Sequence, residues 1–81
     1  MLMFLYVIYD KIAQEAGPVF ESKNDLTAAR GFRLGIPANA NPSEFSLLCI
    51  GSISHGPVKI TGYETPREVV VNDAESLSIE A

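Results

Sequence analysis

The sequence predicts an α+β fold: a small β-α-β-β domain in which one helix packs on a mostly antiparallel sheet of three or four strands. Three observations support this prediction. The N-terminal segment is an almost unbroken apolar run, residues 24–34 carry the signals of a helix, and two further apolar runs are separated by a short turn at residues 54–56. With 81 residues the chain is long enough for only one core.

The first predicted element is a strand over Leu2–Tyr9, which is apolar at nearly every position and rich in aromatic and β-branched residues. Such a run suits a central strand that is covered on both faces. It holds only about nine apolar residues, whereas a membrane helix needs roughly 20, so we expect no membrane segment. Asp10–Phe20 is expected to be a connecting loop with a weak helical turn over Lys11–Ala16.

A helix is predicted over Asn24–Leu34. Ser22 and Asn24 can both cap its start, Asp25 places a negative charge in its first turn, and Gly35 followed by Pro37 ends it. At about 100° per residue, one face of this helix is apolar and is expected to pack on the sheet. That face consists of Leu26, Ala28, Ala29, Phe32 and Ile36.

The second half of the chain predicts a hairpin. After a turn-rich loop, Glu44–Ile53 forms a strand that is apolar on both faces, and Pro57–Tyr63 returns as an antiparallel edge strand, so that 45–53 pairs with 58–63. In the returning strand Val58 and Ile60 are expected to point inward. Residues 69–71, all valine, are a candidate fourth short strand.

The predicted sheet has more apolar surface than one helix can cover. In the Glu44–Ile53 strand, Phe45, Leu47 and Cys49 share one face, and Leu48 and Ile50 share the other. The face without a helix would leave an apolar patch, which soluble monomers seldom expose. We therefore expect a homodimer or a larger symmetric oligomer.

Charge and cysteine content divide the chain and indicate its compartment. The net charge is −4, but residues 1–63 hold equal numbers of positive and negative side chains, so the excess acidity lies in residues 64–81. We expect a single domain over residues 1–71 and a flexible, polar, acidic tail over residues 72–81. The single cysteine, Cys49, excludes an intrachain disulfide and favours a reducing, cytoplasmic compartment.

No combination of residues suited to catalysis is found. His55, the only histidine, lies in the predicted turn and is expected at the surface, and Cys49 lies between apolar neighbours and is expected to be buried and inert. No cluster has the spacing of metal ligands, and no glycine-rich phosphate loop is present. The sequence therefore predicts a protein that is not an enzyme and that needs no cofactor or metal.

Binding of single-stranded nucleic acid remains open. Lys23, Arg30 and Arg33 lie along one side of the predicted helix and could contact phosphates, while Tyr6, Tyr9 or Tyr63 could stack on unpaired bases. The alternative is that the arginines pair with carboxylates, such as Asp10, Glu15 or those of the tail, and that the tyrosines complete the core.

Several short motifs occur in a characteristic order between residues 6 and 66. They are Tyr6-x-x-Tyr9-Asp10, Pro18-x-Phe20, the helix from Asn24-Asp25 to Arg30-x-Phe32, Pro42-Ser43-Glu44-Phe45-Ser46-Leu47, Ile50-Gly51, Gly56 and Thr65-Pro66. In this order the chain resembles the small nonstructural protein of gokushovirus-type microviruses, bacteriophages with circular single-stranded DNA. It departs from that family in the hairpin turn, which is Ser52–His55 here instead of an aspartate-rich turn, and after Pro66.

The resemblance implies an early viral protein, made in the host cell cytoplasm and absent from the virion, that binds DNA or helps to switch from duplex replication to single-strand synthesis and packaging. Two hypotheses follow. The protein either binds single-stranded DNA or controls replication, or it is an adaptor whose dimer face and acidic tail engage the phage replication initiator, a host replication factor or capsid precursors. The charge balance favours the adaptor, and the genome type of the resembled family favours DNA binding.

Overall fold

The computed structural model describes residues 1–71, so the predicted acidic tail over 72–81 lies outside the described residues. In chain order, the described elements are β1 (Leu2–Asp10), β2 (Glu15–Ala16), β3 (Phe20–Ser22), α1 (Asp25–Gly35), a short 3₁₀ helix (Pro42–Glu44), β4 (Phe45–His55) and β5 (Val58–Val69). No helix of residues 1–71 is long and apolar enough to cross a membrane.

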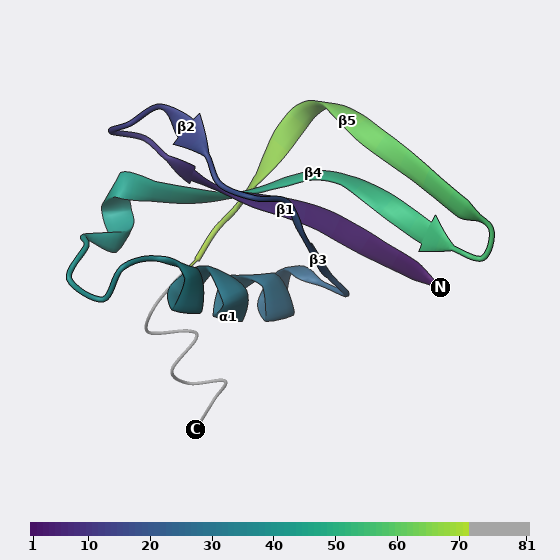
Figure 1. The fold of residues 1–81 in the computed structure, drawn as a ribbon, viewed down its shortest axis with the longest axis horizontal. Coiled ribbons are helices and arrows are strands. Elements are labelled where there is room, and N and C mark those ends of the chain that lie inside the picture. Colours follow the sequence, from purple (N-terminus) through teal and green to yellow (C-terminus); the bar gives the residue numbers. More distant parts are fainter. Residues whose placement is uncertain (72–81) are drawn as a thin grey trace.

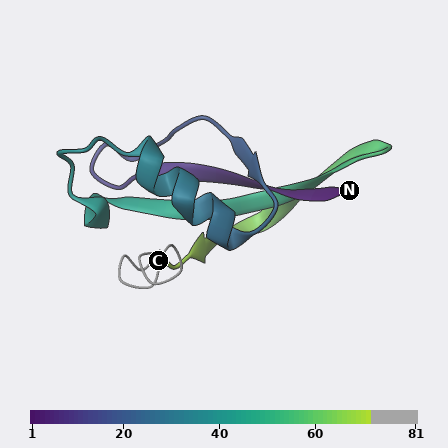
Figure 2. The same cartoon turned by 90° about the horizontal axis from the view of Figure 1, so that it is seen from below.

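One helix lies on one face of an antiparallel sheet, which agrees with the predicted α+β class (Figures 1 and 2). The strand order is β2-β1-β4-β5, and β3 also pairs with β1. All pairings are antiparallel. The sheet thus has five strands instead of three or four, because two short strands precede α1.

These two strands correct the prediction of a loop over Asp10–Phe20. The Asp10 carboxylate accepts hydrogen bonds from the backbone N–H groups of Ile12 and Ala13, both at 3.0 Å, and Gln14 adopts a positive φ of 57°. Such side-chain contacts favour a turn over a helix. The chain therefore reverses here, and β2 and then β3 return along the edge of β1 that β4 does not occupy.

The last strand is one long element with an arch in it. Cys49 of β4 pairs with Arg67 and Gly51 pairs with Gly62, so residues 63–66 of β5 stand opposite Ile50 alone. The strand bends away from β4 at this point and then returns (Figure 1). The separate fourth strand predicted at residues 69–71 is therefore wrong, since β5 reaches its end at Val69.

The tip of the β4–β5 hairpin extends past the N-terminal end of α1 (Figures 1 and 2). Val58 and Ile60 were predicted to point inward, but 72% and 64% of their surfaces are exposed. By register Ile60 lies beside Ile53, and Ile53 beside Met3, on the face of the sheet that α1 does not cover, so these side chains point away from the helix.

The core lies between α1 and the sheet. Its buried members are Tyr6, Ala28, Ala29, Phe32, Leu47, Cys49 and Val69. The helix contributes three of them, and Ile36 packs against the cluster as predicted. Leu26, however, is 49% exposed. At about 100° per residue it lies about 120° from Phe32, whereas Asp25 lies only about 20° from Phe32 and takes the inward position in the first turn.

The start of α1 is capped by one of the two predicted residues. The Asn24 side chain accepts a hydrogen bond of 2.8 Å from the backbone N–H of Thr27, which satisfies one of the free donors at the helix start. Ser22, predicted as a second cap, belongs to β3 and is buried, and its hydroxyl has no hydrogen-bond partner among the described residues.

Candidate nucleic-acid interface

The three predicted cations do not form a single row on the helix. Arg30 and Arg33 belong to α1 and are three residues apart, which places them on neighbouring positions of its surface. Arg30 is exposed and Arg33 is half-buried, and both take part in interactions within the protein. Lys23 precedes the cap residue Asn24 and therefore lies outside the helix, at the end opposite Arg33.

Tyr6 cannot stack on a base, which corrects its prediction as a binding residue. Its side chain is fully buried, and its ring stacks on that of Phe20 with the centroids 5.8 Å apart. The hydroxyl donates a hydrogen bond of 2.7 Å to Asp25. Burial, and then this hydrogen bond, raise the pKa of Tyr6 above its ordinary value, so the phenol stays protonated at neutral pH.

The other two tyrosines lie away from the arginines. Ile8 packs against the core, so the next residue, Tyr9, points to the face of the sheet that α1 does not cover. Tyr63 lies in the arch of β5 and is 37% exposed. Neither ring shares a surface with Arg30 and Arg33, so the predicted combination of these residues in one site is not formed.

Asp25, Arg67 and Tyr6 form a polar network that the sequence analysis did not identify. Arg67 donates two hydrogen bonds to the Asp25 carboxylate, at 2.8 and 3.0 Å. This guanidinium contact lowers the pKa of Asp25 below its usual 3.8, and it raises the pKa of Arg67. The sequence held one signal for this network, which is the position of Asp25 on the same helical arc as the core residue Phe32.

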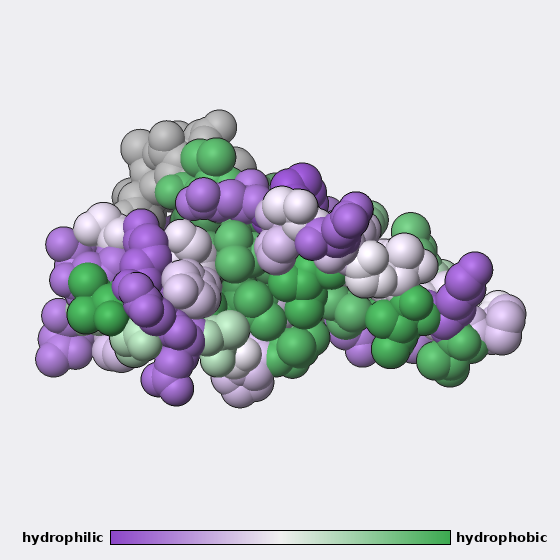
Figure 3. Space-filling view, turned by 90° about the horizontal axis from the view of Figure 1, so that it is seen from above, coloured by the Kyte–Doolittle hydropathy of each residue, from purple (hydrophilic) through white to green (hydrophobic). Residues whose placement is uncertain are grey.

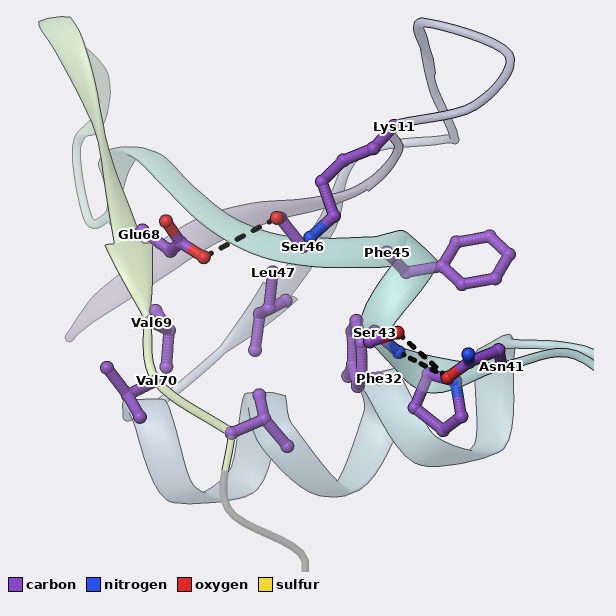
Figure 4. Close-up of a pocket in the computed structure, with 12 residues that line it drawn as sticks. Lys11, Phe32, Asn41, Ser43, Phe45, Ser46, Leu47, Glu68, Val69 and Val70 are labelled. Atoms are coloured by element: carbon purple, nitrogen blue, oxygen red, sulfur yellow. Dashed lines mark hydrogen bonds between the residues drawn. The ribbon is translucent and has the colours of Figure 1, made fainter.

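Two adjoining hollows lie beside the C-terminal half of α1. The larger has a volume of about 480 Å³ and the smaller about 200 Å³. Phe32 and Pro42 line both hollows, which therefore lie next to each other; together they are hereafter called the α1 groove. The larger hollow lies beyond the last residue of β5. The first residues of β4 have no partner in β5 there, so this edge of β4 is open (Figure 4).

The α1 groove has a cation in each of its two parts. Arg33 lines the smaller hollow, and Lys11 lines the larger one, where its side chain points toward Ser46 (Figure 4). Phe45, which is half-buried, adds an aromatic wall. One carboxylate, that of Glu68, also lines the larger hollow and accepts a long hydrogen bond of 3.4 Å from Ser46. Cations beside an aromatic ring are the elements that hold single-stranded nucleic acid.

Neither Cys49 nor His55 lines this groove. Cys49 is fully buried, as predicted. His55 is exposed, as predicted, and its Nε2 lies 2.8 Å from a carboxylate oxygen of Glu21. Within residues 1–71, no three His, Cys, Asp or Glu side chains are close enough to hold a metal ion.

Comparison with known proteins gives one match. The model of a family described as Phage ORF5 protein matches residues 3–77, which is nearly the whole chain. No curated protein and no solved structure matches the chain.

Proposed function

The chain belongs to the Phage ORF5 protein family, and from this premise we propose that it is a non-enzymatic, nonstructural phage protein that binds single-stranded DNA. It acts in the host cell cytoplasm, during single-strand synthesis or packaging. The observation that carries this proposal is the α1 groove, in which Lys11 and Arg33 flank the aromatic walls Phe32 and Phe45.

The groove supports weak binding without sequence preference. Its cations would contact phosphates, and the exposed part of the Phe45 ring would meet a base. Arg30 extends the cationic surface along α1. An arginine carries five N–H donors, so Arg30 and Arg33 can contact a phosphate while they keep an intramolecular contact. Because only a few phosphates are neutralised, affinity should fall steeply with salt.

The decisive experiment is a fluorescence anisotropy titration of a labelled single-stranded 30-mer at low and moderate salt. Lys11→Ala and Arg33→Ala should each weaken binding and reduce the slope of log affinity against log salt by about 0.7, the value for one phosphate contact on a single strand. Lys59→Ala is the matched control, since it removes the same charge from the exposed hairpin tip, at the other end of β4. It should leave the slope unchanged.

Two further variants test the charge of the groove. Glu68→Gln removes the carboxylate that lines it and should tighten binding. Deletion of residues 72–81 removes three negative charges, those of Asp73, Glu75 and Glu80, and should also tighten binding. If neither the full chain nor the shortened chain binds the 30-mer in a salt-sensitive way at low ionic strength, the DNA proposal fails.

The second candidate function is the adaptor. It is favoured by the charge balance, because the whole chain carries a net charge of −4 and a polyanion would be repelled. In that case the partner is a protein: the phage replication initiator, a host replication factor or a capsid precursor. The adaptor predicts that the groove variants leave 30-mer binding absent or unchanged.

A further inference from the structure

The face of the sheet that points away from α1 is apolar. Phe4, Tyr6 and Ile8 of β1 pack on the helix side, so Met3, Leu5 and Val7 point to the opposite face. On β4, Leu48 lies opposite Val7 and shares this face. Figure 3 looks onto it and shows apolar side chains gathered along its middle, with polar side chains at one end, along one long edge and near the opposite tip.

The apolar surface continues onto the hairpin. The register places Met3 opposite Ile53 and Ile53 opposite Ile60, which forms an apolar row across β1, β4 and β5. The outer end of this row is uncovered, because Ile60 is 64% exposed and Val58, two residues before it, is 72% exposed. Val7 is already buried within one copy. We call the surface formed by the other apolar residues, Met3, Leu5, Leu48, Ile53 and Ile60, the open sheet face.

We propose that a second copy of this chain covers the open sheet face, so that the protein is a two-fold symmetric homodimer in which two sheets pack face to face. In such a dimer the helix of each copy lies on the outside. This inference does not depend on DNA binding.

The size of the open sheet face fits a second copy of the chain. The molecule presents the face with an outline of 40 × 18 Å (Figure 3). This outline of the whole molecule, polar ends included, is about 700 Å² in projection, so a partner covering the face would contribute an area of the order of the roughly 800 Å² found in an interface of standard size. A chain with only eight buried apolar residues among those described gains much from this additional burial.

The chemistry of the face also favours a second copy over a charged partner. All five residues that define the open sheet face are apolar. Glu68 pairs with Leu48 and therefore shares this face, but it lies on the edge strand β5, at the rim of the apolar surface. A surface without charge in its middle offers nothing for phosphates or for a charged peptide to recognise. An identical apolar face, in contrast, is complementary to it by symmetry.

Sedimentation equilibrium of the full chain at tens of micromolar tests the inference. The wild type should have twice the monomer mass of 8.8 kDa. Ile60→Glu places a charge in the proposed interface and should raise the dimer dissociation constant about tenfold or more. Because Ile60 is largely exposed within one copy, this variant should keep the fold, which far-ultraviolet circular dichroism would verify.

Leu34→Glu is the matched control. Leu34 is an aliphatic residue that is 83% exposed, but it belongs to α1 on the opposite side of the sheet. The same charge there should leave the dimer intact. A monomeric wild type would overturn the inference, and so would an Ile60→Glu variant that still dimerises as strongly as wild type or a Leu34→Glu variant that dissociates equally.

Discussion

Asp25 in the first turn of α1 and Arg67 in β5 are 42 residues apart in the chain, and two hydrogen bonds of 2.8 and 3.0 Å join them. The pair ties the start of the helix to β5 directly after the arch at residues 63–66. Tyr6 donates a third hydrogen bond to the same carboxylate from the core. One acidic side chain thus connects three elements that the sequence separates widely.

Stability in acid should depend on Asp25. Because its folded-state pKa lies below the ordinary 3.8, the unfolded chain binds the proton more readily, and acid favours unfolding. The stabilisation is complete above about pH 4 and is lost as the pH falls through the folded-state pKa. Urea denaturation of the wild type at decreasing pH should therefore show a decline that is shallower in Asp25→Asn.

The partner variant provides the control for this prediction. In an Arg67→Met background the main cause of the lowered pKa is gone, so Asp25→Asn should change the acid decline much less. At neutral pH the coupling between the two residues should be modest, about 1 kcal/mol or less, because both side chains are about half exposed. An equal effect of Asp25→Asn in both backgrounds would contradict this explanation.

Gly51→Ala should destabilise the protein. A Cβ at this position would collide with the backbone carbonyl of Thr61, which cannot move without breaking the pairing of β4 with β5. Overpacking of this kind costs about 1–3 kcal/mol. Thermal and urea unfolding would measure the loss.

Gly62→Ala is a control for this substitution within the same pair. Gly62 lies directly opposite Gly51, but a Cβ there would have open space around it. Its effect should stay within about 0.5 kcal/mol. Equal losses in the two variants would show that the close approach of Thr61 is not the reason for the glycine.

Gly31→Ala should stabilise the protein. The added Cβ would lie 3.5 Å from Cε2 of Phe20, an ordinary contact distance, in the middle of α1. Alanine is favoured over glycine in a helix by about 0.8–1.0 kcal/mol, and the urea midpoint should rise accordingly. The gain should be smaller for Gly35→Ala, where the new Cβ would lie only 2.8 Å from Cδ1 of Ile8 and that side chain must shift. A lower midpoint for Gly31→Ala would contradict this prediction.

The sequence determined the elements that carry a strong local signal. The apolar run at Leu2–Tyr9 became β1, the Asn24 cap marked the start of α1, and the paired apolar runs formed the β4–β5 hairpin. The buried position of Cys49 also followed from its apolar neighbours. In each case, periodicity or capping within a few residues was sufficient, since such patterns depend only on local geometry.

Only the tertiary structure decided the features that depend on residues distant in the chain. β2 and β3, of two and three residues, are too short for a periodic pattern and form because β1 offers an open edge. Tyr6 is buried, and unavailable for stacking, because Phe20 and Asp25 reach it from other elements. The α1 groove likewise exists because β5 ends at Val69 and leaves the start of β4 open between Lys11 and Phe32. Local patterns cannot specify such contacts, because each requires segments far apart in the chain to meet.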